Sequence, residues 1–153
     1  MLSLELRVPP LLIALVITIG MWVVASIASA QQSLPVFRMY IAVPMALAGV
    51  TIIVAGILVF RRARTTMNPL ESQAPSSLVR SGIYKHTRNP MYAGMLLVLL
   101  AWATFLFTFW CLFGPLVFIL YIDRFQIIPE ERMLSKLFGS DYAEYKTKVR
   151  RWL

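Results

Sequence analysis

The chain of 153 residues is poor in acidic residues, in histidine and in cysteine. It contains seven Asp and Glu residues, one histidine and one cysteine. The lone cysteine, Cys111, excludes an internal disulfide framework and a cysteine metal cluster. The single histidine, His86, has no second metal-ligand residue nearby, so we expect no bound metal. Charged residues make up 14% of the chain, against about 25% in soluble domains, which excludes an ordinary soluble fold.

Apolar residues, by contrast, dominate the sequence. They form 59% of the chain, and they gather in two uncharged stretches, 8–30 and 39–60. Each stretch reaches the length of about 20 residues that a helix needs to cross the hydrocarbon core of a membrane. Because several spans use most of the chain, we expect one membrane-embedded domain over residues 1–153.

A third uncharged stretch, 89–122, is too long for one ordinary span and slightly short for two. Gly114 and Pro115 lie inside it, and this pair relaxes the chain and removes a backbone hydrogen-bond donor. We therefore expect a tight hairpin of two helices, the second running on towards Ile128. The sequence thus predicts an all-α, polytopic membrane bundle of four transmembrane helices, with spans three and four forming the hairpin.

Basic residues predict the orientation of this bundle. One group lies between spans two and three and another follows the hairpin, and only a hairpin puts both on one side, the cytosol. Arg7 then joins them and Arg38 alone lies outside. We expect a multi-pass protein of a bacterial inner membrane with both termini cytosolic. The net charge of +8 follows from this topology and from anionic lipid headgroups, and implies no nucleic acid partner. The two groups are Arg61, Arg62, Arg64, Arg80, Lys85 and Arg88, and then Arg124, Arg132, Lys136, Lys146, Lys148, Arg150 and Arg151.

The N-terminus has an alternative interpretation. Residues 11–24 can be the apolar core of a signal peptide, and 28–30, before Gln31, resembles a cleavage site. Glu5 offsets Arg7 in what should then be a positive region, which favours a retained helix. Cleavage would leave the topology of the later spans unchanged.

The loop before the third span contains more residues that can bind a ligand than a loop-to-helix junction needs. Asn89 followed by Pro90 predicts an N-cap and a proline at the first helical position. The free N–H groups of a helix start can hold a carboxylate, and Gly94, one turn on, would let a ligand approach the backbone. Tyr84 and Tyr92 can bracket a flat ring or face a cation, and each also fits the aromatic belt of a membrane boundary.

An acidic pair, Glu130 and Glu131, lies further along the chain and carries the charge opposite to that of this basic loop. It follows Pro129, and two acids there favour a helix start. The same pair, close to the membrane surface, can hydrogen-bond ribose hydroxyls or offset a bound cation. Asp123 and Arg124 lie just before, within the apolar stretch, where ionisable residues are functional candidates. The sequence leaves both roles of the pair open.

The tail after the acidic pair alternates between apolar and polar positions at helical spacing. Its apolar stripe is interrupted by Gly139 and then resumes, which predicts two short amphipathic helices lying on the cytosolic membrane surface. The stripe consists of Met133, Leu134, Leu137 and Phe138, and then of Tyr142, Tyr145, Val149 and Trp152.

Three motifs follow one another in order: GIYxxxRNPMYxG from Gly82, the pair EE, and LFGxxYxxYxxxVRR ending at Arg151. Together they resemble the integral membrane methyltransferases grouped with isoprenylcysteine carboxyl methyltransferase and phospholipid methyltransferases. The resemblance runs from about Thr65 to Trp152, more than half of the chain. Members bind S-adenosylmethionine at the cytosolic face of a helical bundle and methylate lipophilic or small substrates that can enter from the bilayer.

The resemblance implies where the S-adenosylmethionine site lies, within a cofactor-binding part of about 65–153. It assigns catalysis to Arg88 and Glu131. Asn89 stands where many members have His, and an amide hydrogen-bonds but carries no charge. The cofactor-binding residues that it implies are Gly82, Tyr84, Arg88, Asn89, Pro90, Tyr92, Gly94, Glu130 and Glu131.

The leading functional hypothesis is methyl transfer to a lipophilic or small acceptor that carries a carboxylate, thiol or hydroxyl. A carboxylate or thiolate acceptor needs no general base, since positioning and water exclusion supply much of the rate. The alternatives are methylation of a phospholipid amine, or a non-catalytic membrane protein that binds anionic lipid or a partner protein. Membrane lipids are expected partners in every case.

Overall fold

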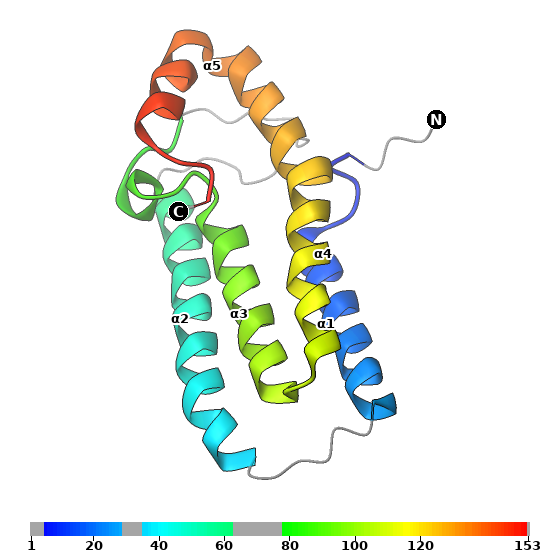
Figure 1. Ribbon diagram of the computed structural model, residues 1–153. Helices are drawn as coiled ribbons and strands as arrows, with labels where there is room; N and C mark the ends of the chain where they lie inside the picture. The colour runs from blue at the N-terminus through cyan, green and yellow to red at the C-terminus, as the bar shows by residue number, and fades with distance from the viewer. Residues whose placement is uncertain (1–4, 29–34, 63–77, 153) are drawn as a thin grey trace.

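The computed structural model describes residues 5–28, 35–62 and 78–152, and within these the chain is helical, with one isolated strand-like bridge. Four apolar helices run alongside one another (Figure 1). A fifth helix, α5 (Ile128–Lys148), extends beyond them. The all-α membrane bundle predicted from the sequence is confirmed. Its four main helices are α1 (Pro10–Ile27), α2 (Pro35–Arg62), α3 (Pro90–Leu106) and α4 (Phe113–Ile122).

Three helical stretches are long and apolar enough to cross a membrane, namely Pro10–Ile27, Val36–Arg62 and Phe109–Lys148, and α3 is a shorter apolar helix. The last stretch has 40 residues, about twice the length of a span. Its apolar part ends near Ile128, so we take 109–128 as the membrane-spanning part. The protein is a multi-pass integral membrane protein.

The reversal between α3 and α4 lies at Phe107, before the predicted position. Phe107 adopts a left-handed conformation (φ 50°, ψ 40°), Thr108 is extended, and the short helix η2 (Phe109–Leu112) leads into α4. The hairpin is thus confirmed, but its assignment to Gly114 and Pro115 is wrong. Both residues lie in the first turn of α4, where a proline forfeits no hydrogen bond. We call this end of the bundle the turn end.

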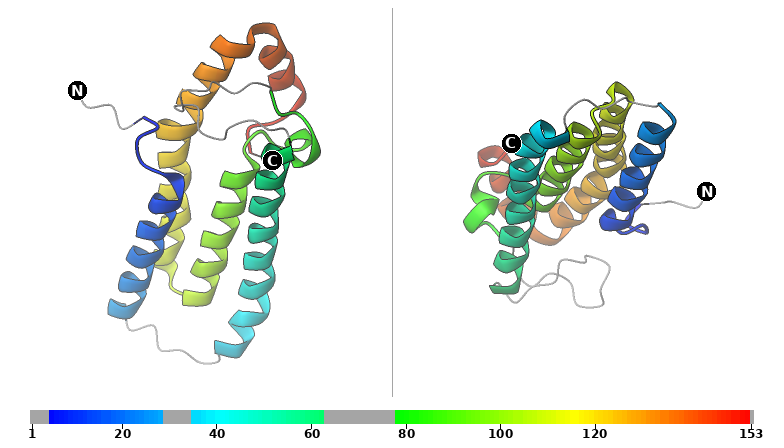
Figure 2. Two further views of the ribbon diagram at one scale, coloured as in Figure 1. Left: turned by 180° about the vertical axis from the view of Figure 1, so that it is seen from behind. Right: turned by 90° about the horizontal axis from the view of Figure 1, so that it is seen from below.

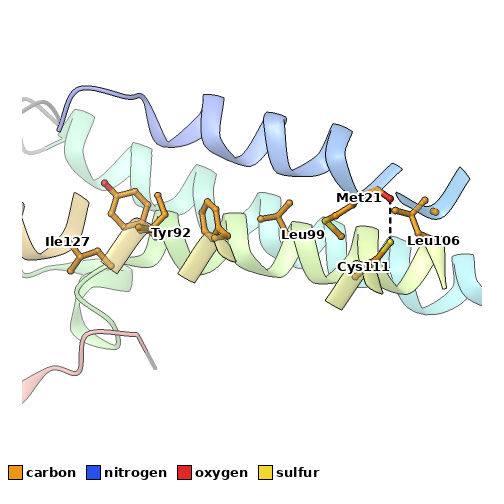
Figure 3. Packing of buried hydrophobic residues seen from close by; sticks show 10 residues of the cluster. Met21, Tyr92, Leu99, Leu106, Cys111 and Ile127 are labelled. Atoms are coloured by element: carbon orange, nitrogen blue, oxygen red, sulfur yellow. Dashed lines mark hydrogen bonds between the residues drawn. The ribbon is translucent and has the colours of Figure 1, made fainter. Parts of the chain in front are cut away.

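The turn end is closed by apolar packing between α1 and the start of α4. A Cβ atom at Gly114 would clash with the Met21 side chain of α1, which would have to shift. Cys111 is buried, and its Sγ donates to the carbonyl oxygen of Met21 at 3.4 Å (Figure 3). The core continues along α1, α3 and α4 through side chains such as Leu99 and Phe118. Cys111 therefore lies next to the turn of the hairpin.

Two glycines bring α2 and α3 into backbone contact. A Cβ atom on Gly94 would lie 2.6 Å from the carbonyl oxygen of Gly49, and one on Gly49 would lie 2.7 Å from that of Gly94. Real Cβ atoms essentially never come so close, and small residues are what allow membrane helices to approach in this way. The Gly49–Gly94 contact thus fixes α3, and with it the residues at its N-terminus, against α2.

At the opposite end, which we call the charged end, α4 passes through a π-helical turn, η3 (Asp123–Ile127), into α5. The helix rises away from the bundle, and Gly139 (φ 49°, ψ −118°) then breaks it (Figures 1 and 2). The second half of α5 folds back over the loop that precedes α3. The break predicted at Gly139 is confirmed.

Part of the apolar stripe of the tail packs inside the protein, and its predicted placement on the membrane surface stays a prediction. Tyr142, Tyr145 and Val149 form a buried cluster with Leu78 and with the first half of α5. These three residues pack against the protein because Gly139 lets α5 double back, whereas Leu137 of the same stripe stays exposed. The possible cleavage point before Gln31 and the loop 63–77 lie outside the described residues.

Candidate functional site

The loop before α3 is fixed on the end of α2. Its short helix η1 (Gly82–Lys85) begins at Gly82, whose φ of +59° and approach to Val59 both favour glycine. A Cβ there would lie 2.8 Å from Val59 Cγ2. The Tyr84 ring is buried edge-on against Phe60 at 5.3 Å. Gly82 and Tyr84 thus position the loop.

The chain end is bound to the same loop by a short parallel pairing. Arg88 N donates to the carbonyl oxygen of Arg150 at 2.9 Å, and Thr87 Oγ1 donates to that of Arg151 at 3.2 Å. Asn89 Nδ2 donates to the same Arg151 oxygen at 2.9 Å. Pro90 begins α3 as predicted, but the Asn89 side chain makes no capping hydrogen bond. Asn89 instead ties the C-terminal segment to the start of α3.

Two arginines converge on one carboxylate at this junction. Arg151 donates from Nε to Glu131 Oε1 at 3.1 Å and from Nη2 to Oε2 at 2.8 Å. Arg88 Nη2 lies 3.3 Å from Glu131 Oε1. Asp123, from η3, adds a second carboxylate 3.9 Å from Arg151. We call this set, Arg88, Asp123, Glu131 and Arg151, the ion cluster.

These contacts do not supply a partner for every hydrogen-bond donor of Arg88. Its side chain is 12% exposed, yet its Nε and Nη1 atoms are buried and have no hydrogen-bond partner among the described residues. Asp123 Oδ1 is likewise buried and lacks a hydrogen bond within the described chain. More than nine in ten buried polar groups are hydrogen-bonded in native proteins, so each exception requires an explanation. The two free donors, Nε and Nη1, lie on different edges of the guanidinium, so they fit two separate acceptor oxygens rather than one bidentate fork.

The neighbouring acid, Glu130, has a different environment. Tyr92, in the first turn of α3, donates its hydroxyl to Glu130 Oε1 at 2.6 Å. Burial raises the pKa of Glu130 to about 7, the Tyr92 hydrogen bond opposes the rise, and the charge of Glu131 adds to it. Glu130 is therefore poised to change protonation near neutral pH, beside the ion cluster.

The structure brings some of the predicted site residues together and separates others. Arg88, Tyr92, Glu130 and Glu131 meet at the charged end. Gly94 does not belong with them, because the space beside it is filled by α2 and leaves no room for a ligand to reach the backbone. We therefore assign Gly94 to helix packing.

Sequence reasoning missed Arg151 as a site residue. It counted this arginine only as one of the positive charges that set topology. The signal was present in the motif that ends in VRR, but the contact with Glu131 spans 20 positions along the chain and depends on the fold of α5.

Comparison with known proteins identifies the family. The family model described as phospholipid methyltransferase matches residues 37–141. The match includes nearly all of α2, all of α3 and α4, and α5 without its last turns. This match covers more than half of the chain. The chain belongs to the phospholipid methyltransferase family. The resemblance inferred from the sequence motifs is thereby confirmed.

Two relatives of this phospholipid methyltransferase family member illustrate its range. An uncharacterised protein of Haemophilus influenzae is 49% identical over 63 residues, which are 41% of this chain and 100% of that protein. The protein-S-isoprenylcysteine O-methyltransferase of Saccharomyces cerevisiae is 33% identical over 82 residues, 47% of this chain and 30% of that enzyme. The match to the yeast enzyme thus covers under a third of its length. No solved structure matches the chain significantly.

Proposed function

We propose that this protein is an S-adenosylmethionine-dependent methyltransferase that acts at the membrane on a lipophilic or small acceptor. The family supports methyl transfer. The observation that supports the cofactor is that two buried nitrogens of Arg88 have no hydrogen-bond partner within the described part of the chain. The charged end would then be the cofactor site, and the apolar helices would admit the acceptor from the bilayer.

Arg88 fits the carboxylate of the cofactor's amino-acid part. The free Nη1 of the guanidinium can donate a charge-assisted hydrogen bond to one oxygen of that carboxylate, and the free Nε, on another edge, can donate to a second acceptor. Arg88 is held for this task by Glu131, which shares it with Arg151. Glu131 therefore orients Arg88, and Arg151 balances the remaining charge of Glu131.

The acids of the site fit the rest of the same molecule. Oxygens of Glu130 and Asp123 can accept hydrogen bonds from ribose hydroxyls or face the ammonium group, and Asp123 Oδ1 is buried without a hydrogen bond among the described residues. Tyr92 fixes the Glu130 carboxyl in place. The residues present thus offer complementary partners to both charged ends of the cofactor.

When bound, S-adenosylmethionine supplies an electrophilic methyl group on a positively charged sulfur. The contribution of the protein is to orient the acceptor and to exclude water, because the sulfonium charge disappears during transfer and a dry site favours that neutralisation. A carboxylate or thiolate acceptor requires no base in this scheme. The yeast relative is named for O-methylation of an isoprenylcysteine, which agrees with such an acceptor.

A phospholipid amine is the second candidate acceptor, and Glu130 is the observation that favours it. An amine must lose a proton to complete methylation, and a carboxyl whose pKa is about 7 is well matched to accept one at neutral pH. The family description names phospholipids as well. Product analysis with phosphatidylethanolamine and with an isoprenylated cysteine analogue would separate the two.

We propose that the charged end faces the cytosol. Helix α2 ends there in Arg61 and Arg62, and positive residues collect on the cytosolic side of membrane proteins. A reporter fused after the C-terminus should be active inside the cell. An external signal would reverse the orientation and place the site on the wrong side for a cytosolic cofactor.

The test of the function is thermal unfolding of the purified protein with S-adenosylhomocysteine. A ligand that binds only the folded state at 100 times its dissociation constant raises the free energy of unfolding by about 2.7 kcal/mol. We expect a rise in melting temperature that adenosine, which lacks the carboxylate, does not reproduce. Transfer of a labelled methyl group to a membrane extract would then identify the acceptor. No stabilisation by saturating S-adenosylhomocysteine would contradict the proposal.

A further inference from the structure

A second polar site lies on the far side of the loop before α3. It is a cleft of about 290 Å³ formed by residue 80, by η1 and by the end of α5. It shares no residue with the ion cluster. The cleft is lined by Arg80, Lys85, Glu144, Tyr145, Lys148 and Val149.

The charge of the cleft is positive. Three of its six lining residues are cations and one is an acid. Glu144 is already paired with Lys148, and Arg80 makes only a long contact of 3.6 Å with the exposed Asp141. Lys85 has no ion-pair partner among the described residues. The cleft thus offers donors from three chain segments to an anion.

The position of the cleft matches the depth of lipid phosphates. Helix η1 rests on the last turns of α2, because Gly82 lies against Val59 and Tyr84 packs edge-on against Phe60. Directly after Phe60, the apolar span gives way to charged residues. Lys85, at the end of η1, is therefore held at the boundary between hydrocarbon and water. Anionic headgroups attract basic residues at this depth by about 1 kcal/mol for each Lys or Arg.

The floor of the cleft is apolar and buried. Tyr145 and Val149 are buried, and the Tyr145 hydroxyl donates to the carbonyl oxygen of Tyr84 at 2.6 Å. A bound molecule would therefore meet ring and methyl surface below and ammonium and guanidinium groups around it. Glycerol and phosphate in one molecule fit this pattern better than a fully hydrated inorganic ion does.

We propose that the cleft binds the phosphate of an anionic phospholipid headgroup. The lipid joins η1 to the end of α5 through Lys85 and Lys148, and so holds the folded-back half of α5 against the membrane. This site is separate from the cofactor site and does not depend on catalysis. The shared chemistry is a phosphate anion, and the source is the bilayer rather than solution.

The experiment measures binding of a fluorescent short-chain phosphatidylglycerol to the full-length protein in neutral detergent micelles, by anisotropy. Lys85→Gln should weaken binding about fivefold, the equivalent of about 1 kcal/mol, whereas Lys85→Arg should retain it. The matched control is Lys136→Gln, an exposed lysine of α5 outside the cleft. Melting temperatures of all variants should agree, because both lysines are exposed.

Several results would overturn the proposal. Equal losses in Lys85→Gln and Lys136→Gln would show attraction to the general surface charge and no defined site. Displacement of the lipid by inorganic phosphate at the same concentration as by unlabelled phosphatidylglycerol would assign the cleft to free phosphate. If short-chain phosphatidylcholine bound as tightly as phosphatidylglycerol, the cleft would not require a net negative charge on the lipid. Displacement by phosphatidylglycerol alone would support the lipid.

Discussion

The two ends of the bundle handle buried polar groups in different ways. At the turn end, Cys111 donates to Met21 and the buried Arg38 guanidinium lies over the Phe107 ring at 4.2 Å. At the charged end, Arg88 keeps two buried nitrogens and Asp123 one buried oxygen without hydrogen bonds among the described residues. Within the described chain, every buried side-chain atom that lacks a partner lies at the charged end. Over residues 5–28, 35–62 and 78–152, the turn end leaves no buried side-chain nitrogen or oxygen without a hydrogen bond or ring contact.

This difference separates the part of the bundle that stabilises the fold from the part that can bind a ligand. The middle and the turn end are held by apolar cores and by the backbone contact of Gly49 with Gly94, which require no charge. Unsatisfied buried donors are costly, at roughly 1 to 3 kcal/mol for each group. A fold stabilised elsewhere can tolerate that cost at a site where a ligand supplies the missing partner. We therefore expect substitutions in the packing region to lower stability, and substitution of Arg88 at the charged end to lower ligand affinity.

The largest effect should come from Gly94, which tests the packing region. Gly94→Leu should prevent folding, and Gly94→Ala should lower the free energy of unfolding by about 1 to 3 kcal/mol, because its Cβ meets the backbone of α2. The measurement is unfolding in detergent. The matched control is Gly20→Ala on α1, where a Cβ meets nothing within 4 Å and the change should be neutral or stabilising. If Gly94→Ala kept native stability but lost affinity for the cofactor, Gly94 would have to be assigned to the cofactor site.

A smaller effect is expected from Arg151, which sharpens the comparison at the charged end. Arg151→Gln removes two charged hydrogen bonds to Glu131 and should lower the free energy of unfolding by about 1.5 to 3 kcal/mol. Arg150→Gln is the control, since its exposed side chain is replaced while its backbone pairing survives, and its change should stay within about 0.5 kcal/mol. If both variants unfold alike, the Arg151–Glu131 contact contributes nothing measurable.

The smallest effect, when expressed per pH unit, is a pH dependence that originates at Glu130. Its pKa is raised from 4.5 to about 7 by burial, so the folded protein holds a proton that the unfolded chain releases. This contribution to stability is complete below about pH 4.5 and is lost as the pH rises through 7. Between these values the slope from Glu130 should be roughly 1 kcal/mol per pH unit. Glu130→Gln should flatten the profile measured by thermal unfolding, and the exposed Glu144→Gln should not.

The fold was largely predictable because span length and charge asymmetry are properties of the sequence itself. The hairpin could be located but not its turn, since a left-handed Phe107 has no sequence signature comparable to that of Gly114 and Pro115. At the site, adjacent residues such as Glu130 and Glu131 could be found. Their separate partners, Tyr92 and the two arginines, could not, because these contacts depend on tertiary packing.

The central claim, that Arg88 binds the carboxylate of the cofactor, is tested most directly by removing that carboxylate from the ligand. We would measure dissociation constants of S-adenosylhomocysteine and of its decarboxylated analogue for the native protein and for Arg88→Gln. The native protein should prefer S-adenosylhomocysteine by roughly tenfold or more, as expected for a hydrogen-bonded charge pair, and Arg88→Gln should bind both ligands equally weakly. A preference for the carboxylate that persists in Arg88→Gln, or its absence in the native protein, would contradict the account.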